Sequence, residues 1–325
     1  MKSLIRENEG VALILTILII SIVVSVTLQF NKSMWSNLHA ASNMADAVKL
    51  RCIARSGFNG GLAALYEDGL SNNTDTLREI WAVTGFLINS ESSVFEEGGF
   101  HVDISDLSGR IQINQLVDKE GNYNDTQKLV FSRFLSLPEF GLEIEEIENI
   151  MDAIKDWIDS DGETTRFGAE DSYYQSLERS YPCKNGPLEF LEELLLVRGI
   201  TRELFYGSAE RPGISSFISI YGDGKININT ASRTVIRSLS DEIDEDRVEE
   251  IIAYRGDEKN DLSDKTWYKM VPGMAGVTMP DSIITTSSNY FNIVSEGFKG
   301  KMKKRIYSAV MRQQRSIKII SWKVE

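Results

Sequence analysis

The amino-acid sequence predicts an α+β protein in which one long N-terminal helix packs on a small antiparallel sheet that carries a large, mostly helical insert. Three observations favour this fold. An apolar stretch near the N-terminus continues into an amphipathic helical pattern. One alternating segment near residue 100 and three segments at the C-terminus are typical of short strands. The chain between them carries helical patterns and an internal repeat.

The composition limits the classes of function. The 325 residues allow one large domain or two smaller ones. A formal net charge of -13 disfavours nucleic-acid binding, which depends on Lys and Arg that displace phosphate counterions, and favours divalent cations or basic partners. Two histidines are too few for most imidazole-based catalytic or zinc sites. Cys52 and Cys183 lack C-x-x-C spacing, and the sequence is compatible with a disulfide or with two free thiols.

The N-terminal helix is predicted to begin as a membrane span. Residues 11–30 are uncharged and apolar, long enough to cross a hydrocarbon core of about 30 Å as a helix. A cleaved secretory signal is the alternative, but the apolar run exceeds the usual length and no A-x-A site follows it. Lys2 and Arg6 precede the span and predict a cytoplasmic N-terminus with an exported body, although Lys32 follows it.

The helix is predicted to continue beyond the membrane. If unbroken to about Tyr66 it would be on the order of 85 Å long. Gly57, Gly60 and Gly61 predict a looser or kinked last portion. A helix that is apolar at first and amphipathic later suits a filament subunit, because its first half can move from the bilayer into a filament core. The helical stripe consists of Met34, Trp35, Leu38, Ala41, Met44, Ala45, Val48, Ile53, Leu62 and Leu65.

The strands follow a polar stretch at residues 67–97, which we interpret as a connection with a short apolar helical piece at residues 80–87. An alternating strand, FHVDI, follows Gly99. Three further strand candidates, NYFNIVSEG, KKRIYSAVMRQ and SIKIISWKVE, close the chain. They are short, rich in β-branched residues and separated by turns, which predicts an antiparallel meander packed on the helix.

The insert contains a degenerate repeat. The first copy opens with RIQIN at Arg110 and ends at Ile200, and the second opens with KININ at Lys225 and ends at Met274. Each has an extended I-x-I-N piece, two helices and a final short helix before V-x-G-[IM]. The pattern resembles SAM-like and helix-hairpin-helix modules, whose glycine hairpin binds DNA phosphate. The corresponding segment here, SLSDEIDEDRVEE, has no glycine and many carboxylates, so packing is favoured over DNA binding.

The densest chemical signal is the segment DWIDSDGETTRFGAEDSYY. Like charges this close repel unless a cation joins them, and calcium takes six to eight oxygen ligands. The spacing from Asp159 follows an EF-hand loop until the sixth position, where Thr164 replaces glycine. A metal site and a solvated acidic loop are both compatible with these residues. The acids are Asp156, Asp159, Asp161, Glu163, Glu170 and Asp171.

The N-terminus carries a family resemblance. ENEG followed by VALILTILII resembles the prepilin leader, in which a prepilin peptidase cuts after glycine and the new N-terminus is methylated. The resemblance implies cleavage between Gly10 and Val11. Most pilins and pseudopilins have glutamate at the fifth mature position, whereas Leu15 stands there, as in the K-type minor pseudopilin of type II secretion. A buried carboxylate costs about 2.5 to 3.5 kcal/mol in a bilayer unless it is paired, and a subunit with no neighbour above it receives no pairing amine.

The insert extends this resemblance. DWIDSDG, GAEDSYY and GPLEFLEELLLVRG are similar in residues and order to the insert of K-type pseudopilins, the general secretion pathway protein K family, which binds calcium. The family implies Asp159, Asp161, Glu170 and Asp171 as ligands, with Asp156 and Glu163 as further candidates. The expected division is a leader at 1–10, a transmembrane part at 11–30, its amphipathic continuation at 31–68, a connection and first strand of a pilin-like domain at 69–109, a helical insert at 110–285 and C-terminal strands at 286–325.

The resemblance implies a minor pseudopilin in the tip complex of a type II secretion pseudopilus, anchored in the bacterial inner membrane with its body in the periplasm. The implied partners are the I-type and J-type minor pseudopilins, the prepilin peptidase, and secreted substrate or the outer-membrane channel. The sequence has no nucleophile elbow, phosphate loop or H-E-x-x-H motif, so we expect no enzyme activity. The alternatives are a membrane-tethered helix-hairpin-helix protein for DNA binding or uptake and an anchored periplasmic enzyme.

Overall fold

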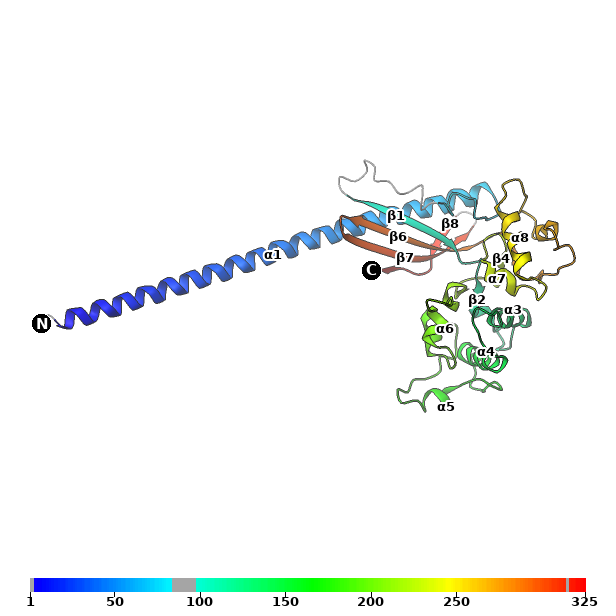
Figure 1. Cartoon of the computed structure of the whole chain (residues 1–325), viewed down its shortest axis with the longest axis horizontal. Coiled ribbons are helices and arrows are strands. Elements are labelled where there is room, and N and C mark those ends of the chain that lie inside the picture. Colours follow the sequence, from blue (N-terminus) through cyan, green and yellow to red (C-terminus); the bar gives the residue numbers. More distant parts are fainter. Residues whose placement is uncertain (1–2, 84–97, 314–315) are drawn as a thin grey trace.

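The computed structural model describes residues 3–83, 98–313 and 316–325. Figure 1 shows an elongated molecule in which helix α1 (Ser3–Ser71) extends from a globular body, with the N-terminus at its far end. The body has two hydrophobic cores, one between α1 and a sheet and the other within the helical insert. The predicted α+β class and the long helix packed on an antiparallel sheet are confirmed.

The looser last portion predicted for α1 is wrong, because the helix continues to Ser71. Gly57 and Gly61 allow close packing on the sheet instead, whereas a Cβ on Gly60 would meet no atom within 4 Å. A Cβ on Gly57 would lie 2.5 Å from Ser295 Oγ, and a Cβ on Gly297 of the sheet would lie 2.7 Å from the Leu50 carbonyl oxygen. The Ser295 hydroxyl donates a 2.7 Å hydrogen bond to the Ala54 carbonyl. The helix and the sheet therefore approach each other almost backbone to backbone.

The sheet has the predicted antiparallel meander. Its order is β1-β6-β7-β8, and β9 also pairs with β7. The last predicted strand is divided in two, since the Ile320 and Ser321 amides both reach the Ala309 carbonyl, at 2.8 and 3.2 Å. The strands are β1 (Gly99–Asp106), β6 (Tyr290–Lys299), β7 (Met302–Gln313), β8 (Ser316–Ile319) and β9 (Lys323–Val324).

The connection after α1 contributes to the core under the sheet. Trp81 is only 1 % exposed, and its ring lies edge-on to Phe291 at 5.2 Å. The predicted helical piece at residues 80–87 forms turns as far as residue 83, and its remainder lies outside the described residues. The connection is thus part of the packing between helix and sheet and not only a link.

The insert contains both predicted repeat copies. The I-x-I-N segment of each copy enters a short parallel ladder, β2 with β3 and β4 with β5. The partner strands β3 (Ile218–Ser219) and β5 (Ile284–Thr285) are absent from the sequence prediction. The other elements are β2 (Ile111–Gln112), η1 (Ile113–Gln115), α3 (Asp125–Leu135), α4 (Ile144–Ile158), α5 (Asp171–Tyr174), η2 (Leu191–Leu196), α6 (Arg202–Tyr206), η3 (Ile214–Ser216), β4 (Ile226–Asn227), α7 (Arg233–Ser238), α8 (Glu245–Gly256) and η4 (Trp267–Met270).

The asparagine that ends each I-x-I-N segment explains why the two copies close in the same way. Asn114 accepts a hydrogen bond from the Leu188 amide at 2.8 Å and donates to the Leu188 and Ile220 carbonyls. Asn229 accepts from Trp267 Nε1 at 2.7 Å and donates to the Leu262 carbonyl. Each amide satisfies backbone or ring groups that are partly or fully buried. The same residue therefore fastens the start of each copy to its closing segment.

A buried polar cluster joins the helix, the sheet and the insert. Arg312 of β7 pairs with Asp75 and, at 2.6 Å, with Asp68, and it donates to the Ser288 carbonyl. Asn227 of the insert donates to the Asp75 carbonyl at 3.1 Å and to the Ser288 hydroxyl at 2.7 Å. Burial raises the pKa of the Asp75 carboxyl to about 6, although Arg312 opposes this shift. The cluster fixes the insert on the C-terminal end of helix α1.

Candidate functional site

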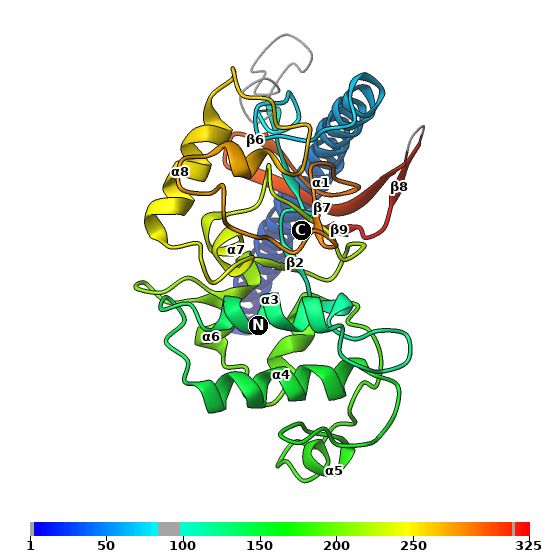
Figure 2. The same ribbon diagram turned by 90° about the vertical axis from the view of Figure 1, so that its right-hand side faces the viewer.

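The acidic site lies where α4 ends. The Asp159 amide caps the helix by donating to the Lys155 carbonyl at 2.8 Å, and the chain then returns to place Glu170 just before α5. Carboxylate oxygens of Asp159, Asp161 and Glu170 all lie within 4.8 Å of one another. Figure 2 shows α5 at the end of the insert farthest from the sheet, so the acidic site lies in the outer part of the body.

Two of these three carboxylates, those of Asp159 and Glu170, are buried with oxygens that lack hydrogen-bond donors. Within the described part of the chain, Asp159 Oδ1 and both oxygens of Glu170 accept no N–H or O–H hydrogen bond. Burial, together with repulsion from Asp156 and Asp159, raises the pKa of Glu170 to about 7. Burying a carboxylate without a partner is costly. The free oxygens therefore suit a bound cation.

The other predicted acids lie outside this group. Asp156 is buried and accepts from the Thr165 amide at 3.1 Å, so it holds the loop. Asp171 accepts from the Cys183 amide at 2.7 Å, and Glu163 is exposed. A Cβ on Gly168 would collide with Asp156 Oδ2, which explains the glycine at this position.

Two residues of the site escaped the sequence analysis. Lys155 Nζ lies 2.5 Å from Asp159 Oδ2, and the i,i+4 spacing on a predicted helix could have revealed this pair. Asn185 donates to the Asp161 carbonyl from a residue far along the chain, for which no sequence signal exists. The two cysteines form no disulfide, and Cys52 is exposed whereas Cys183 is buried.

The donor set fits a hard divalent cation. All three candidate ligands are carboxylates, and hard cations such as calcium prefer oxygen ligands. The site also lies at the C-terminus of a helix, where the macrodipole is negative and disfavours further negative charge. Lys155 is the basic residue in the last turn of α4, and one ammonium does not balance three carboxylates. The arrangement thus calls for additional positive charge.

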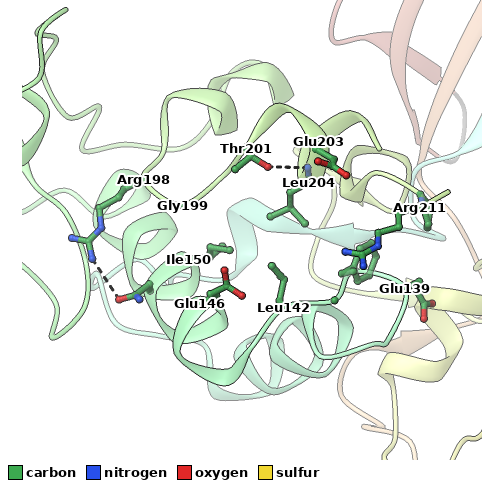
Figure 3. A pocket seen from close by; sticks show the side chains of 14 residues that line it. Glu139, Leu142, Glu146, Ile150, Arg198, Gly199, Thr201, Glu203, Leu204 and Arg211 are labelled. Carbon is green, nitrogen blue, oxygen red and sulfur yellow. Dashed lines mark hydrogen bonds between the residues drawn. The ribbon is translucent and has the colours of Figure 1, made fainter. Parts of the chain in front are cut away.

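A cleft lies beside the N-terminal half of α4, away from the end that carries the acidic site. It has a volume of about 350 Å³ and combines apolar side chains with Glu146, and Arg198 and Arg211 lie at opposite edges (Figure 3). Arg198 donates to the carbonyls of Phe167, at 3.2 Å, and Gly168, at 2.9 Å, both in the acidic loop. The wall of the cleft is therefore hydrogen-bonded to the loop that carries the candidate metal ligands.

Within the described residues, α1 is the one helix long and apolar enough to cross a membrane. Its most apolar 18-residue window has a mean hydropathy of 3.0 and no buried residue. The hydroxyls of Thr16 and Thr27 donate to the carbonyls of Leu13 and Val23 in their own helix, so they need no water. Gly10, before this stretch, is exposed, and a Cβ there would meet no atom within 4 Å. These properties suit a single-pass anchor.

Comparison with known proteins connects the fold to a family. The model of the type II secretion system (T2SS) protein K family matches residues 109–207 and 226–278, one segment in each repeat copy. The type II secretion system protein K of Pseudomonas aeruginosa is 27% identical over 320 residues, which cover 94% of this chain and 90% of that protein. The protein of the same name from Aeromonas hydrophila is 24% identical over 330 residues, 94% of each chain.

A solved structure has the same fold. A chain in the crystal structure of the GspK-GspI-GspJ complex from the enterotoxigenic Escherichia coli type 2 secretion system superposes with a TM-score of 0.69 at 17% identity. The superposition covers 88% of this chain and 99% of that chain. These relatives give no support to the DNA-uptake alternative. With its apolar anchor helix and pilin-like sheet, the chain belongs to the type II secretion system protein K family, the K-type minor pseudopilins.

Proposed function

We propose that this protein caps the tip of a type II secretion pseudopilus, in complex with the I-type and J-type minor pseudopilins. The observation that supports the proposal is the position of the insert relative to helix α1. Figure 1 shows the insert beside and beyond the C-terminal end of α1, where a following subunit of a filament would stack. A subunit of this shape suits the last position in the filament. The related chain of known structure belongs to a GspK-GspI-GspJ complex.

The N-terminal part of α1 then serves as anchor and as assembly element. We propose a single pass through the bacterial inner membrane, with the body in the periplasm and residues 1–10 in the cytoplasm. The prepilin peptidase would cut between Gly10 and Val11 and methylate Val11. Leu15 agrees with a terminal subunit, because a carboxylate at this position would lack the amine of a subunit above it.

The role that we propose is structural and not catalytic. The protein would prime filament assembly and present the insert to secreted substrate or to the outer-membrane channel. Immunogold electron microscopy of pseudopili with an antibody against the insert tests the terminal position. We expect one gold cluster at a single end of each filament. Labelling along the shaft would refute the capping role.

We also propose that the acidic site binds calcium. Asp159, Asp161 and Glu170 would supply the ligand oxygens, and Asp156 and Asp171 would hold the loop that presents them. The support comes from the donor-free oxygens of Glu170 and Asp159 and from the surplus negative charge at the end of α4. Bound calcium would neutralise this charge and join the end of α4 to the start of α5.

Calcium should raise the melting temperature of the full chain in detergent micelles. At a free calcium concentration of 100 times Kd, the stabilisation should be about 2.7 kcal/mol. Asp159→Ala combined with Asp161→Ala should remove the effect. Glu145→Ala combined with Glu148→Ala is the matched control, because both residues are exposed acids on the same α4 helix. An equal calcium response in both double variants would disprove the site.

A further inference from the structure

We infer that Lys155 is an internal counter-ion of the acidic site, which supports the loop when calcium is absent and weakens calcium binding when calcium is present. This inference rests on the proposed calcium site and adds a residue that tunes its affinity. It follows from the position of the ammonium group, from the charge of the site and from the oxygen of Asp159 that stays free.

The ammonium group lies within the acidic site. Lys155 Nζ is 2.5 Å from Asp159 Oδ2, and the two side chains are 14% and 0% exposed. The ammonium therefore occupies part of the space beside the carboxylates and supplies positive charge there, as a metal ion would.

Lys155 occupies only one side of the Asp159 carboxylate. Oδ2 accepts a hydrogen bond from the ammonium group, whereas Oδ1 is buried and has no hydrogen bond in the described part of the chain. Neither oxygen of Glu170 accepts an N–H or O–H hydrogen bond in this part of the chain, and the Cys183 thiol lies beside this carboxylate. A cation can thus bind Oδ1 and Glu170 while Lys155 keeps its contact with Oδ2, so the lysine and the metal share one carboxylate.

The charges of the site explain why Lys155 would weaken calcium binding and stabilise the calcium-free site. The three clustered carboxylates carry three negative charges when ionised, and Lys155 offsets one of them, which leaves a surplus that suits a divalent cation. The neighbouring Asp156 adds to this surplus. The ammonium repels calcium over a short distance in a partly buried site, where such repulsion is poorly screened. Without calcium, the same ammonium is the cation that offsets the carboxylates at the negative end of the α4 dipole.

A second lysine provides a matched control. Lys128 Nζ lies 3.8 Å from the centroid of the Tyr123 ring, and Lys155 Nζ lies 6.0 Å from the same centroid. In the described structure Lys128 has no ion pair with a carboxylate. Removing either lysine changes the net charge equally and alters the surroundings of the same tyrosine, but only Lys155 contacts the carboxylates.

The test uses the full chain in detergent micelles, with calorimetric titration of calcium chloride and thermal unfolding in a chelator. We expect Lys155→Met to bind calcium about tenfold more tightly than the wild type, and Lys128→Met to stay within about twofold. In chelator, Lys155→Met should melt at a lower temperature than Lys128→Met. Lys155→Arg keeps the charge and should resemble the wild type in both measurements.

The outcomes separate this inference from the calcium proposal. If the wild type and Lys155→Met bind calcium equally, and Asp159→Ala with Asp161→Ala does not bind it, the lysine does not tune a site that nevertheless exists. If neither the wild type nor Lys155→Met binds calcium, both proposals fail. If Lys155→Met unfolds in chelator, Lys155→Arg provides the test. Calcium binding by Lys155→Arg that is tighter than in the wild type would contradict a role for the positive charge of Lys155.

Discussion

Gly10→Val is expected to leave an uncut precursor and to reduce type II secretion to background. A peptidase that cuts after glycine must bring its catalytic groups close to this backbone, and a branched side chain blocks that approach. The folded chain itself offers no obstacle, since Gly10 is exposed and an added Cβ would meet no atom within 4 Å. Mass spectrometry of the N-terminus should find the first ten residues retained and Val11 unmethylated.

Gly60→Val on the same helix is the control for this experiment. A Cβ on Gly60 also meets no atom within 4 Å, so both variants change helix propensity without a collision. We expect the Gly60 variant to be cut, methylated and active in secretion. A Gly10→Val chain that is processed normally would remove the basis for assigning the leader. Loss of secretion in both variants would indicate a defect in the helix instead.

Arg312→Met is expected to cost about 3 to 5 kcal/mol in the free energy of unfolding. The guanidinium is 11% exposed and pairs with Asp68 and Asp75, which are 9% and 1% exposed. Removing it leaves two carboxylates without their counter-ion where helix, sheet and insert meet. Thermal and denaturant unfolding of the full chain in detergent, followed by circular dichroism, should show the loss.

Arg305→Met on the same strand provides the comparison. Arg305 is 48% exposed and pairs with Glu296, which also binds Lys303. Exposed ion pairs of this kind contribute about 0 to 1 kcal/mol, so we expect a small change. Similar losses in the two variants would show that the buried cluster contributes no more than a surface pair. A larger effect at Arg305 would contradict the argument from burial.

Much of the fold could be predicted because its elements carry periodic patterns. The helical pattern of α1 and the alternation in β1, β6 and β7 are local signals that the structure confirms. Of the predicted apolar stripe, only the C-terminal part packs on the sheet, with Ile53 and Leu65 buried, whereas Met34, Trp35, Leu38, Met44 and Val48 are exposed. The strands β3 and β5 could not be found, since each has two residues and exists only through pairing with a distant I-x-I-N segment. The looser end predicted from Gly57, Gly60 and Gly61 was wrong, because Gly57 and Gly61 pack against the sheet, a tertiary contact that the sequence does not display.

The candidate site shows the same limit. The sequence identifies carboxylates in one loop, but it does not reveal which of them converge. Asp159, Asp161 and Glu170 come together, whereas Asp171 is bound to the Cys183 amide, a partner that only the folded loop brings near. Lys155 was detectable from helical spacing, and Asn185 was not, because its contact with Asp161 spans unpatterned chain.

The glycines between α1 and the sheet have a mechanical consequence. Long side chains at an interface can bend and slip when one element is pulled, but here the strand backbone lies directly against the helix backbone at Gly297. A force applied along α1 would therefore be transmitted to the sheet with little relative displacement of the two elements. Arg312 of the sheet is joined to Asp68 of α1 and to Asp75 and Ser288, so the buried cluster would transmit this force on to the insert. We therefore expect the helix, the sheet and the insert to move as one rigid body.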